Sequence, residues 1–343
     1  MALLSVRELV TRFEFGPHSF NVVDGVSLEI EPGETIGIVG ESGSGKSLTL
    51  RSIVHALPPK AAITSGSVVF KGQDFTRPGR RELRRLRGRE ISMIFQDPIA
   101  ALNPVLTVGD QLKETLKQTK GVRNENARAR AATELLRIVG VPEPDRRMRS
   151  YGHELSGGLA QRVVIALALV GEPTLLLADE PTSALDVTVQ AQILSLLVDL
   201  QHRFQMAVLF VSHDLGVVAQ TCRRVYVMYA GRIVEEAPIR DLFASPRHPY
   251  TVGLLSSMPS LDPSAAIQRL RAIPGSPPDL AALPTGCRFR SRCPISVDEC
   301  AQDDVLLAHV KPGHSAACLR HEAVADGAVV YGASDSRVHP GSS

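Results

Sequence analysis

Residues 34–47 read ETIGIVGESGSGKS, an apolar run followed by a glycine-rich loop that ends in Lys-Ser. The apolar run predicts a buried strand, and the stretch after the loop predicts a helix. The loop fills every fixed position of the phosphate-loop pattern with Gly40, Glu41, Ser42, Gly43, Ser44, Gly45, Lys46 and Ser47. In this pattern backbone N–H groups surround phosphate oxygens, the lysine reaches the β and γ phosphates, and the serine hydroxyl binds Mg²⁺. The stretch therefore predicts a site for a nucleoside triphosphate and Mg²⁺.

A second apolar run, residues 174–178, leads directly into Asp179 and Glu180. In open α/β sheets ligands bind at the carboxyl ends of the strands, so these two carboxylates are expected beside the phosphate loop. We predict that Asp179 holds Mg²⁺ through its water shell. Glu180 is predicted to polarise the water that attacks the γ-phosphate.

Two more apolar runs, residues 91–95 and 207–211, alternate with stretches of helical character. Strands that are buried on both faces and separated by helices predict an α/β fold with a mostly parallel sheet. Residues 4–10 and 22–30 predict strands of a smaller sheet, and residues 107–140 predict two helices. Beyond about residue 259 prolines multiply and the periodicity fades, which predicts an irregular extension that depends on its cysteines for order.

Residues 155–158 read LSGG and are followed by Gln161 and Arg162. They precede the apolar stretch 163–170 and match the signature sequence of ABC ATPases, except that Leu159 stands where many members have Gln. The chain thus resembles the ATP-binding subunits of ABC transporters. The resemblance implies an ABC-type P-loop NTPase with a RecA-like core, an N-terminal antiparallel β subdomain and a helical subdomain at about 98–165. It also implies that Ser156, Gly157 and Gly158 serve the ATP held by a second subunit.

Further landmarks of this family follow in order along the chain. The resemblance makes Gln96 the glutamine that senses metal and water, and residues 183–186 the loop that contacts the second subunit. It makes His213 the switch histidine that reaches the γ-phosphate. An aromatic ring of the N-terminal sheet stacks on adenine in this family, and Phe13 is the predicted residue with Phe15 as the substitute. Taken singly, His213 and each phenylalanine have an ordinary structural role as the alternative.

The C-terminal part carries a more selective resemblance, to the extension of oligopeptide/dipeptide importer ATPases. It rests on residues 246–251 (PRHPYT) and on a later run, 273–318, that holds Cys287, Cys293, Cys300 and Cys318. The resemblance favours a 4Fe-4S cluster on these four thiolates. Zinc, with His314 as a possible participant, and unliganded or disulfide states are the alternatives. The isolated Cys222 is predicted to be a small core residue.

We expect an ATPase domain at 1–259, a C-terminal domain at 260–322 and, from its small and polar residues, a flexible tail at 323–343. The resemblance implies an ATP hydrolase that binds ATP and Mg²⁺ and powers the uptake of dipeptides or oligopeptides across the cell membrane. The implied partners are a second, related ATPase chain in a heterodimer, two transmembrane permease subunits and, through the complex, an extracytoplasmic substrate-binding protein. The protein would lie peripherally on the cytoplasmic face of the inner (plasma) membrane.

Other functions are left as alternatives. The sequence does not identify the cargo, so a nickel, sugar or other importer is one of them. A soluble ABC ATPase of DNA repair or translation is disfavoured, because the chain has one cassette and no long insertion between the phosphate loop and Asp179. An inactive regulatory subunit is disfavoured by the presence of Lys46, Asp179, Glu180 and His213 together.

The composition sets broad limits on partners. The formal net charge is +2, from 38 Lys and Arg against 36 Asp and Glu, which neither indicates nor excludes nucleic acid. No run approaches the about 18 consecutive apolar residues of a membrane-spanning helix, and the first residues lack a signal core. The basic run at 77–89 has no interleaved aromatic residues of the kind that stack on bases, so it predicts a solvated helix. We therefore expect no nucleic-acid partner.

Overall fold

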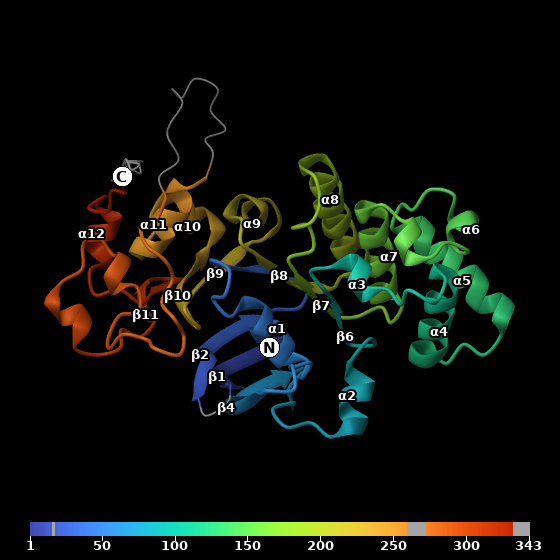
Figure 1. The fold of residues 1–343 in the computed structure, drawn as a ribbon, viewed down its shortest axis with the longest axis horizontal. Helices are drawn as coiled ribbons and strands as arrows, with labels where there is room; N and C mark the ends of the chain where they lie inside the picture. The colour runs from blue at the N-terminus through green and yellow to red at the C-terminus, as the bar shows by residue number, and fades with distance from the viewer. Residues whose placement is uncertain (16–17, 259–271, 332–343) are drawn as a thin grey trace, which may run out of the picture.

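The central element of the fold is an eight-stranded sheet with the order β11-β12-β10-β9-β3-β8-β7-β6. The computed structural model describes residues 1–15, 18–258 and 272–331 (Figure 1). The parallel part of this sheet consists of β9 (Arg224–Tyr229), β3 (Thr35–Val39), β8 (Ala207–Ser212), β7 (Leu175–Asp179) and β6 (Ile91–Ile94). The four predicted core strands are therefore confirmed, and the α/β class with a mostly parallel sheet is confirmed with them.

A second sheet is formed by the N-terminal part of the chain and is antiparallel. Its order is β2-β1-β4-β5, with β1 at Leu4–Phe15, β2 at His18–Ile30, β4 at Ala61–Phe70 and β5 at Gln73–Asp74. Helix α1 (Lys46–Ile53) contacts this sheet as well as β7 of the central sheet. Its residues Leu50 and Ile53 are fully buried in the shared apolar cluster. Because both sheets hold α1, the position of its N-terminus is fixed from two sides.

Helix α2 (Arg80–Leu86) precedes β6, and the segment between β6 and β7 is mostly helical. This segment contains α3 (Pro98–Ala101), α4 (Val108–Lys120), α5 (Glu125–Ile138), α6 (Pro144–Arg147), η1 (Gly152–Glu154) and α7 (Gly157–Leu169). The two helices predicted in 107–140 are α4 and α5, and both begin at a capping side chain. Thr107 accepts a hydrogen bond from the Asp110 backbone N–H, and Asn124 accepts one from Ala127. Figure 1 shows this helical group, in green, at one end of the molecule.

The chain after β7 covers the sheet and then extends it. Helices α8 (Val187–Phe204) and α9 (Leu215–Thr221) flank β8, and β10 (Arg232–Pro238), α10 (Ile239–Ala244) and α11 (Pro249–Ser256) follow β9. The last described elements are η2 (Arg290–Arg292), η3 (Asp298–Ala301), β11 (Ala308–Lys311), β12 (His314–Ala316) and α12 (His321–Ala325). Strand β12 pairs antiparallel with β10, so the C-terminal extension continues the central sheet. Among the described helices, none has both the length and the apolar character needed to cross a membrane.

The predicted domain boundaries stay predictions. The boundary between 259 and 260 falls in the stretch 259–271, which lies outside the described residues. The predicted flexible tail includes residues 323–331, yet these residues contain the end of α12, and Val324, Val329 and Tyr331 are buried. They pack against the main apolar cluster. The rest of the predicted tail, 332–343, lies outside the described residues.

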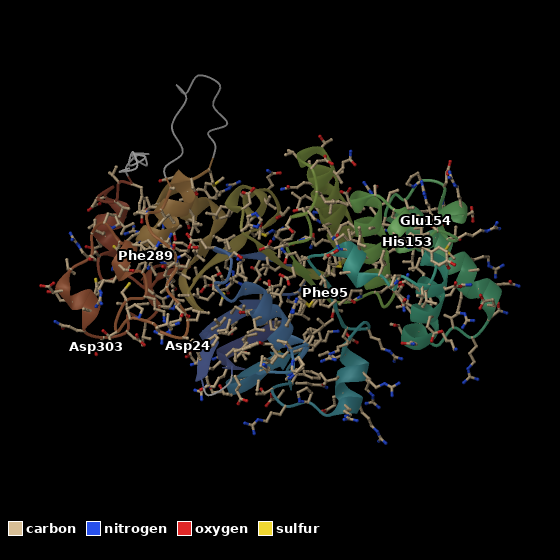
Figure 2. All side chains as sticks on the ribbon, viewed as in Figure 1. Asp24, Phe95, His153, Glu154, Phe289 and Asp303 are labelled. Atoms are coloured by element: carbon tan, nitrogen blue, oxygen red, sulfur yellow. The ribbon has the colours of Figure 1, made fainter. Side chains whose placement is uncertain are left out.

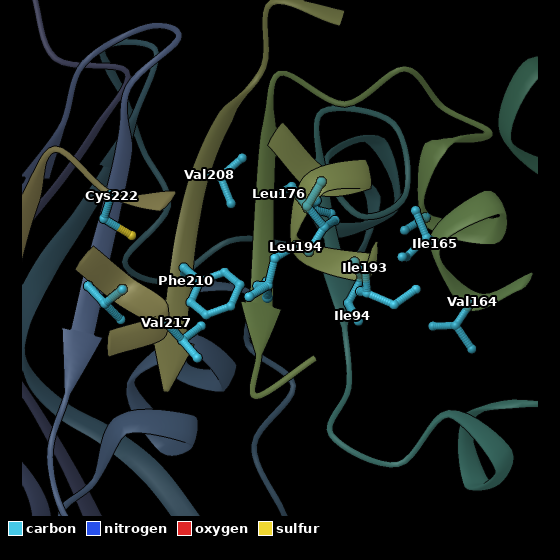
Figure 3. Close-up of a cluster of buried hydrophobic side chains, with 14 of the residues drawn as sticks. Ile94, Val164, Ile165, Leu176, Ile193, Leu194, Val208, Phe210, Val217 and Cys222 are labelled. Atoms are coloured by element: carbon cyan, nitrogen blue, oxygen red, sulfur yellow. The ribbon is translucent and has the colours of Figure 1, made fainter. Parts of the chain in front are cut away.

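The main apolar core lies between the sheet and its helices (Figure 3). Phe210 and Val208 of β8 and Leu176 of β7 pack with Ile193 of α8, all at or near zero exposure. Cys222 belongs to the same cluster, which confirms its predicted role as a small core residue. Burial raises the pKa of the Cys222 thiol to about 12, so this thiol stays protonated and unreactive at neutral pH.

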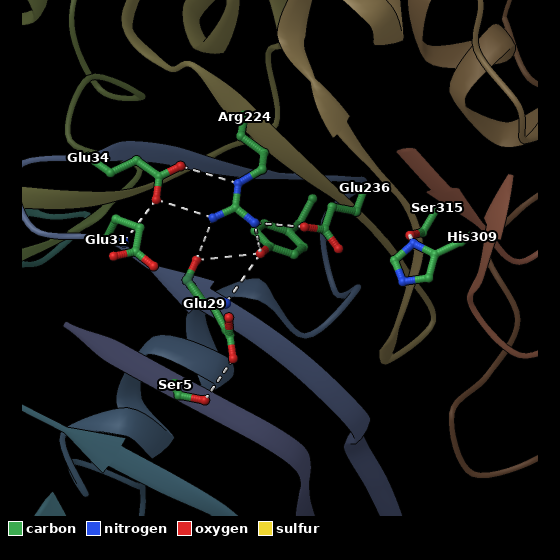
Figure 4. Close-up of polar contacts among 9 residues, drawn as sticks. Ser5, Glu29, Glu31, Glu34, Arg224, Glu236, His309 and Ser315 are labelled. Atoms are coloured by element: carbon green, nitrogen blue, oxygen red, sulfur yellow. Dashed lines mark hydrogen bonds and ion pairs between the residues drawn. The ribbon is translucent and has the colours of Figure 1, made fainter. Parts of the chain in front are cut away.

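A polar network ties the N-terminal sheet to the central sheet (Figure 4). Arg224, at the start of β9, donates hydrogen bonds to Glu34 at 3.2 Å and to Glu236 at 2.7 Å. It also donates to the backbone carbonyl of Glu29 at the end of β2, at 2.8 Å. The half-buried guanidinium thus joins β9 and its neighbour β10 to residues 29–34, about 190 positions earlier in the chain. Because β3 begins next to Glu34, this network holds the strand that delivers the phosphate loop.

Candidate functional site

The phosphate loop lies between β3 and α1, as predicted from residues 34–47. Gly45 is the N-cap of α1 and has φ of 107°, in the left-handed region that side chains rarely adopt. A Cβ atom at this position would lie 2.5 Å from the Val22 carbonyl oxygen. At Gly40 a Cβ atom would lie 2.1 Å from the Met228 carbonyl oxygen. The neighbouring backbone therefore requires glycine at both positions, and this close packing fixes the shape of the loop.

Lys46 is the first residue of α1 and is almost fully buried. Its Nζ donates to the carbonyl oxygens of Gly40 at 2.8 Å and Glu41 at 2.9 Å. It lies 4.0 Å from Glu180 Oε1. Burial lowers the pKa of Lys46, and the nearby carboxylates, Glu180 above all, oppose that shift. The ammonium group is thus desolvated and donates to two neutral carbonyl oxygens. The anionic oxygens of a phosphate group would be stronger acceptors for it than these carbonyls.

Ser47 and Asp179 meet in spite of their separation in the sequence. The Ser47 hydroxyl donates to Asp179 Oδ1 at 2.7 Å. Asp179, at the end of β7, is 1% exposed, and burial raises the pKa of its carboxyl above the usual value. The hydrogen bond from Ser47 opposes that rise. A hydroxyl and a buried carboxylate in contact supply the hard oxygen ligands that suit Mg²⁺.

Glu180 is the residue on which the other predicted groups converge. Its Oε2 accepts a hydrogen bond from Gln96 Nε2 at 3.3 Å and lies 3.2 Å from His213 Nδ1. With Lys46 on the other carboxylate oxygen, three side chains from separate elements surround one carboxylate. Its backbone has φ of 44°, a left-handed conformation that is costly for a residue with a side chain. Such a strained conformation persists only where the surrounding structure maintains it, and it is found often at functional sites.

All of these groups except the buried Asp179 open onto one cleft of about 1100 Å³. The cleft is lined by Glu41, Ser42, Gly43, Gly45, Lys46, Ser47, Gln96, Glu180, Ser183, Ala184 and His213, all from predicted motifs. It is also lined by Val22, Leu48, Asp97 and Leu254, which sequence reasoning did not single out for the site. Leu254 does follow the quoted PRHPYT stretch, whereas no pattern marked Val22. The structure thus brings the phosphate loop, the strand-end carboxylate, Gln96 and His213 together.

The signature residues lie elsewhere in the chain and do not line this cleft. Ser156 is the N-cap of α7 and accepts a hydrogen bond from the Leu159 backbone N–H at 3.4 Å. A Cβ atom at Gly158 would lie 2.6 Å from Val189 of α8, so the helices approach closely there. At Gly157 a Cβ atom would lie 3.2 Å from Leu185. The signature loop therefore packs beside the 183–186 loop.

The predicted adenine-stacking residue does not lie in the cleft either. Phe13 of β1 faces Phe20 of β2 across the hairpin, with ring centroids 6.2 Å apart and planes at 30°. It is absent from the residues that line the cleft. The side chain of the substitute, Phe15, lies outside the described ones. Val22, further along β2, is the N-terminal-sheet residue that reaches the cleft.

The four clustered cysteines line one small pocket together. Cys287, Cys293, Cys300 and Cys318 are free thiols of intermediate burial. Burial raises the pKa of Cys293 to about 11 and that of Cys318 to about 12, which keeps both thiols protonated when no metal is bound. The pocket has about 20 Å³, which is room for about one water molecule.

The pocket does not match the expected iron–sulfur site as it stands. Within the described ranges, no group of three or more His, Cys, Asp or Glu side chains is arranged to hold a metal ion. His314, considered as a zinc ligand, is fully buried and lies 2.7 Å from Glu235 Oε1, and it does not line the pocket. A 4Fe-4S cluster is therefore not supported by this geometry, because a cluster needs far more room than one water molecule.

Comparisons with known proteins agree with the motifs. Residues 23–183 match the family model described as ABC transporter, and residues 234–300 match the oligopeptide/dipeptide transporter C-terminal region. The chain is 49% identical over 327 residues to a probable peptide ABC transporter ATP-binding protein of Sinorhizobium fredii, covering 94% of this chain and 96% of that one. It is 46% identical over 338 residues to a dipeptide transport ATP-binding protein of Bacillus subtilis, covering 96% and 98%.

Solved structures show the same cassette fold. A dimeric bacterial ABC transporter cassette matches with a TM-score of 0.62 at 29% identity, over 69% of this chain and 99% of that one. An ABC transporter subunit from Clostridium perfringens matches with a TM-score of 0.60 at 27% identity, over 74% and 95%. These matches leave out about a quarter to a third of this chain.

Proposed function

This chain belongs to the ATP-binding subunits of ABC transporters, in the oligopeptide/dipeptide group, and we propose that its cleft hydrolyses ATP to power the import of peptides. The observation that carries this proposal is the convergence of Lys46, Gln96 and His213 on Glu180, beside the contact between Ser47 and Asp179. A cation and a base on one cleft, with a pair of hard oxygen ligands of which Ser47 lines the cleft and Asp179 contacts Ser47, are the parts that phosphoryl transfer to water requires.

Binding of ATP begins at the phosphate loop in this proposal. Lys46 exchanges the carbonyl oxygens of Gly40 and Glu41 for oxygens of the β and γ phosphates, because anionic acceptors bind a desolvated ammonium more strongly. Backbone N–H groups of the loop and of the first turn of α1 receive the remaining phosphate oxygens. Ser47, Asp179 and Gln96 would hold Mg²⁺, which neutralises charge on the phosphates when bound.

Hydrolysis then depends on Glu180. Its carboxylate accepts a proton from the attacking water, and His213 and Gln96, both in contact with Glu180 Oε2, orient the carboxylate and the water. The left-handed backbone at Glu180 holds the carboxylate at the edge of the cleft. His213 is more than half exposed on the cleft side, so it can follow the γ-phosphate when ATP binds and leave when phosphate departs.

A second ATPase subunit completes the site in this proposal. Ser156, Gly157 and Gly158 lie outside the cleft of their own chain and open a helix, so their backbone N–H groups suit a phosphate held by another subunit. We propose a related chain in a heterodimer, two permease subunits and an extracytoplasmic binding protein as the assembly. The site of action is the cytoplasmic face of the inner membrane. Opening and closing of the ATP-bound dimer would drive the permease.

Purification tests this function against its rivals. The complex is isolated from its native host through an affinity tag on this chain, and its other components and its peptide-stimulated ATP hydrolysis are measured. Co-purification of hydrophobic permease subunits, with hydrolysis stimulated by a peptide-loaded binding protein, supports the proposal. Stimulation by a binding protein loaded with a nickel complex or a sugar would show that this compound, and not a peptide, is the cargo. Co-purification of nucleic acid without permease subunits would contradict the transport function and favour an ABC ATPase of repair or translation.

The iron–sulfur cluster is a separate and finer proposal. The four cysteines on one pocket support a shared ligand, whereas the size of the pocket requires the thiols to move apart for a cluster to enter. Iron, zinc and sulfide are measured in protein purified without oxygen, and compared between the parent and the Cys293→Ser variant. About four irons and four sulfides per chain, lost in the variant, support the cluster. Stoichiometric zinc selects the zinc alternative, and the absence of both metals contradicts any metal centre.

A further inference from the structure

The C-terminal extension reaches the phosphate loop directly through Arg292. The guanidinium donates two hydrogen bonds to the carboxylate of Glu41, from Nη1 to Oε2 at 2.8 Å and from Nη2 to Oε1 at 2.9 Å. Glu41 is the second residue of the loop, and Arg292 lies 251 positions later, at the end of η2 and next to Cys293. This is the paired geometry in which arginine binds carboxylates most strongly.

Arg292 is itself held in one orientation. Its Nε donates to the Pro274 carbonyl oxygen at 2.9 Å, and its Nη1 lies 3.4 Å from the Tyr229 hydroxyl. The guanidinium carbon lies 5.9 Å from the ring centroids of both Tyr229 and Phe289. With 6% of the residue exposed, the side chain has little freedom to leave Glu41. A buried, oriented fork of this kind acts as a fixed anchor for the carboxylate.

Tyr250 of α11 provides a second attachment to the same loop residue. Its hydroxyl accepts a hydrogen bond from the Glu41 backbone N–H at 2.7 Å. The Tyr250 ring is fully buried and packs on Tyr229 and Phe289, with centroids 4.7 Å and 5.5 Å away. Figure 2 labels Phe289 within the C-terminal part of the molecule. Both attachments therefore come from the part of the chain that follows β9, and one aromatic cluster supports them.

The contacts of Arg292 and Tyr250 with Glu41 also affect Lys46, because Lys46 binds the backbone of Glu41. The amide of Glu41 is fixed by Tyr250 and its side chain by Arg292, while its carbonyl oxygen accepts the hydrogen bond from Lys46 Nζ. Arg292 of the extension and Tyr250 of α11 thus set where the first turn of the loop lies. That turn determines the resting position of the ammonium group and of the N–H groups that face the phosphates.

We propose that Arg292, with Tyr250, is a positioning residue of the nucleotide site, so that the cysteine-bearing extension sets the affinity of the phosphate loop for ATP. This inference rests on the proposed function, because it assigns the loop to ATP. Neither residue touches the cleft, and each acts through Glu41. An extension that is displaced or disordered would release Glu41 and weaken ATP binding without altering Glu180.

The test compares Arg292→Met, Glu41→Gln and the double variant, in the full chain and in the assembled transporter. Each single variant is expected to raise the Kd and the KM for Mg-ATP on the order of tenfold while kcat changes little, a typical coupling between linked sites. The double variant is expected to be no worse than either single one, since both remove the same contact. Arg292→Lys keeps the charge but not the paired fork, so it should give an intermediate KM.

Arg288→Met is the matched control. Arg288 lies in the same segment and its side chain is also largely buried, at 11% exposed against 4% for Arg292, but it donates to Asp24 and to the Ala230 carbonyl oxygen, not to the loop. It should lower the melting temperature about as much as Arg292→Met while the KM for Mg-ATP stays near the parental value. Equal KM values in Arg288→Met and Arg292→Met, or additive effects of Arg292→Met and Glu41→Gln, would overturn the inference.

A reference variant separates this inference from the proposed function. Lys46→Ala is expected to lose Mg-ATP binding whatever the role of Arg292. If Lys46→Ala binds Mg-ATP normally, the proposed function fails and the inference fails with it. If Lys46→Ala loses binding while Arg292→Met and Glu41→Gln keep the parental KM, the proposed function stands and only the positioning role of Arg292 is refuted.

Discussion

Replacing Glu180 by Gln keeps the shape of the side chain and removes its negative charge. Gln96 Nε2, His213 Nδ1 and Lys46 Nζ lie 3.3, 3.2 and 4.0 Å from the Glu180 carboxylate oxygens. A neutral amide can still occupy this position, so the cleft is expected to keep its form. The amide cannot accept the proton of the attacking water, and this is the function that the substitution removes.

The expected loss of hydrolysis follows from the role of a general base. Such a group contributes about 10²-fold to 10⁴-fold to a rate, so kcat should fall by at least about 10²-fold. That fall corresponds to about 2.7 kcal/mol of activation free energy. Binding of ATP should be retained or strengthened, because a carboxylate near the γ-phosphate is gone while Lys46 can still exchange the loop carbonyls for phosphate oxygens. Slow hydrolysis with intact binding should lead to accumulation of the closed, ATP-bound dimer.

The assay measures single-turnover hydrolysis, the Kd for Mg-ATP and the subunit association state in the parent and in Glu180→Gln. Glu172→Gln is the control, since Glu172 is an exposed carboxylate paired with Lys120, away from the cleft. It should hydrolyse ATP at the parental rate. Parental turnover in Glu180→Gln would refute the assignment of the base, and loss of ATP binding in that variant would refute the separation of binding from hydrolysis.

The remaining predictions concern binding, the metal and pH. Lys46→Ala should abolish useful ATP binding in a calorimetric titration, because no other side chain cation reaches the loop carbonyls of Gly40 and Glu41 in the described structure. Ser47→Ala should raise the Mg²⁺ concentration for half-maximal hydrolysis at least about tenfold, since a hydrogen bond to a charged group contributes about 1.5–3 kcal/mol. Loss of the Ser47 hydrogen bond also raises the pKa of Asp179 further, so the Mg²⁺ requirement of the variant should increase as pH falls. Burial lowers the pKa of His248 from 6.5 to about 3, so the folded state holds the neutral ring, and stability present above pH 6.5 is lost as pH falls toward 3. His248→Asn keeps an acceptor for the backbone N–H two residues later and should flatten the fall of melting temperature across that window.

Local patterns were sufficient to predict the centre of the site. The loop at residues 40–47 and the carboxylates after residues 174–178 are short motifs, and each brings its own strand or helix with it. Parallel pairing of β7 with β8 and of β8 with β3 then places Asp179 beside Ser47. The sequence predicts these contacts because the carboxyl ends of parallel strands lie at the same edge of the sheet, where the residues that follow each strand come together.

Contacts that depend on tertiary packing could not be predicted in this way. Residue type and position predict Phe13 for adenine stacking, but the β1–β2 hairpin places it against Phe20. His314 was a candidate metal ligand, yet the pairing of β12 with β10 places it against Glu235 in the core. The contact of Arg292 with Glu41 spans 251 positions, and no local sequence pattern marks it.

The central claim is that this chain converts ATP hydrolysis at Glu180 into the import of peptides, and vesicles reconstituted with the complete transporter test it most directly. Uptake of a labelled peptide is measured with Mg-ATP supplied on the side of this chain, using complexes that carry either the parental chain or Glu180→Gln. We predict uptake that requires ATP in the parental complex and stops in the Glu180→Gln complex, although that complex still binds ATP. Equal peptide uptake by the two complexes would contradict the account.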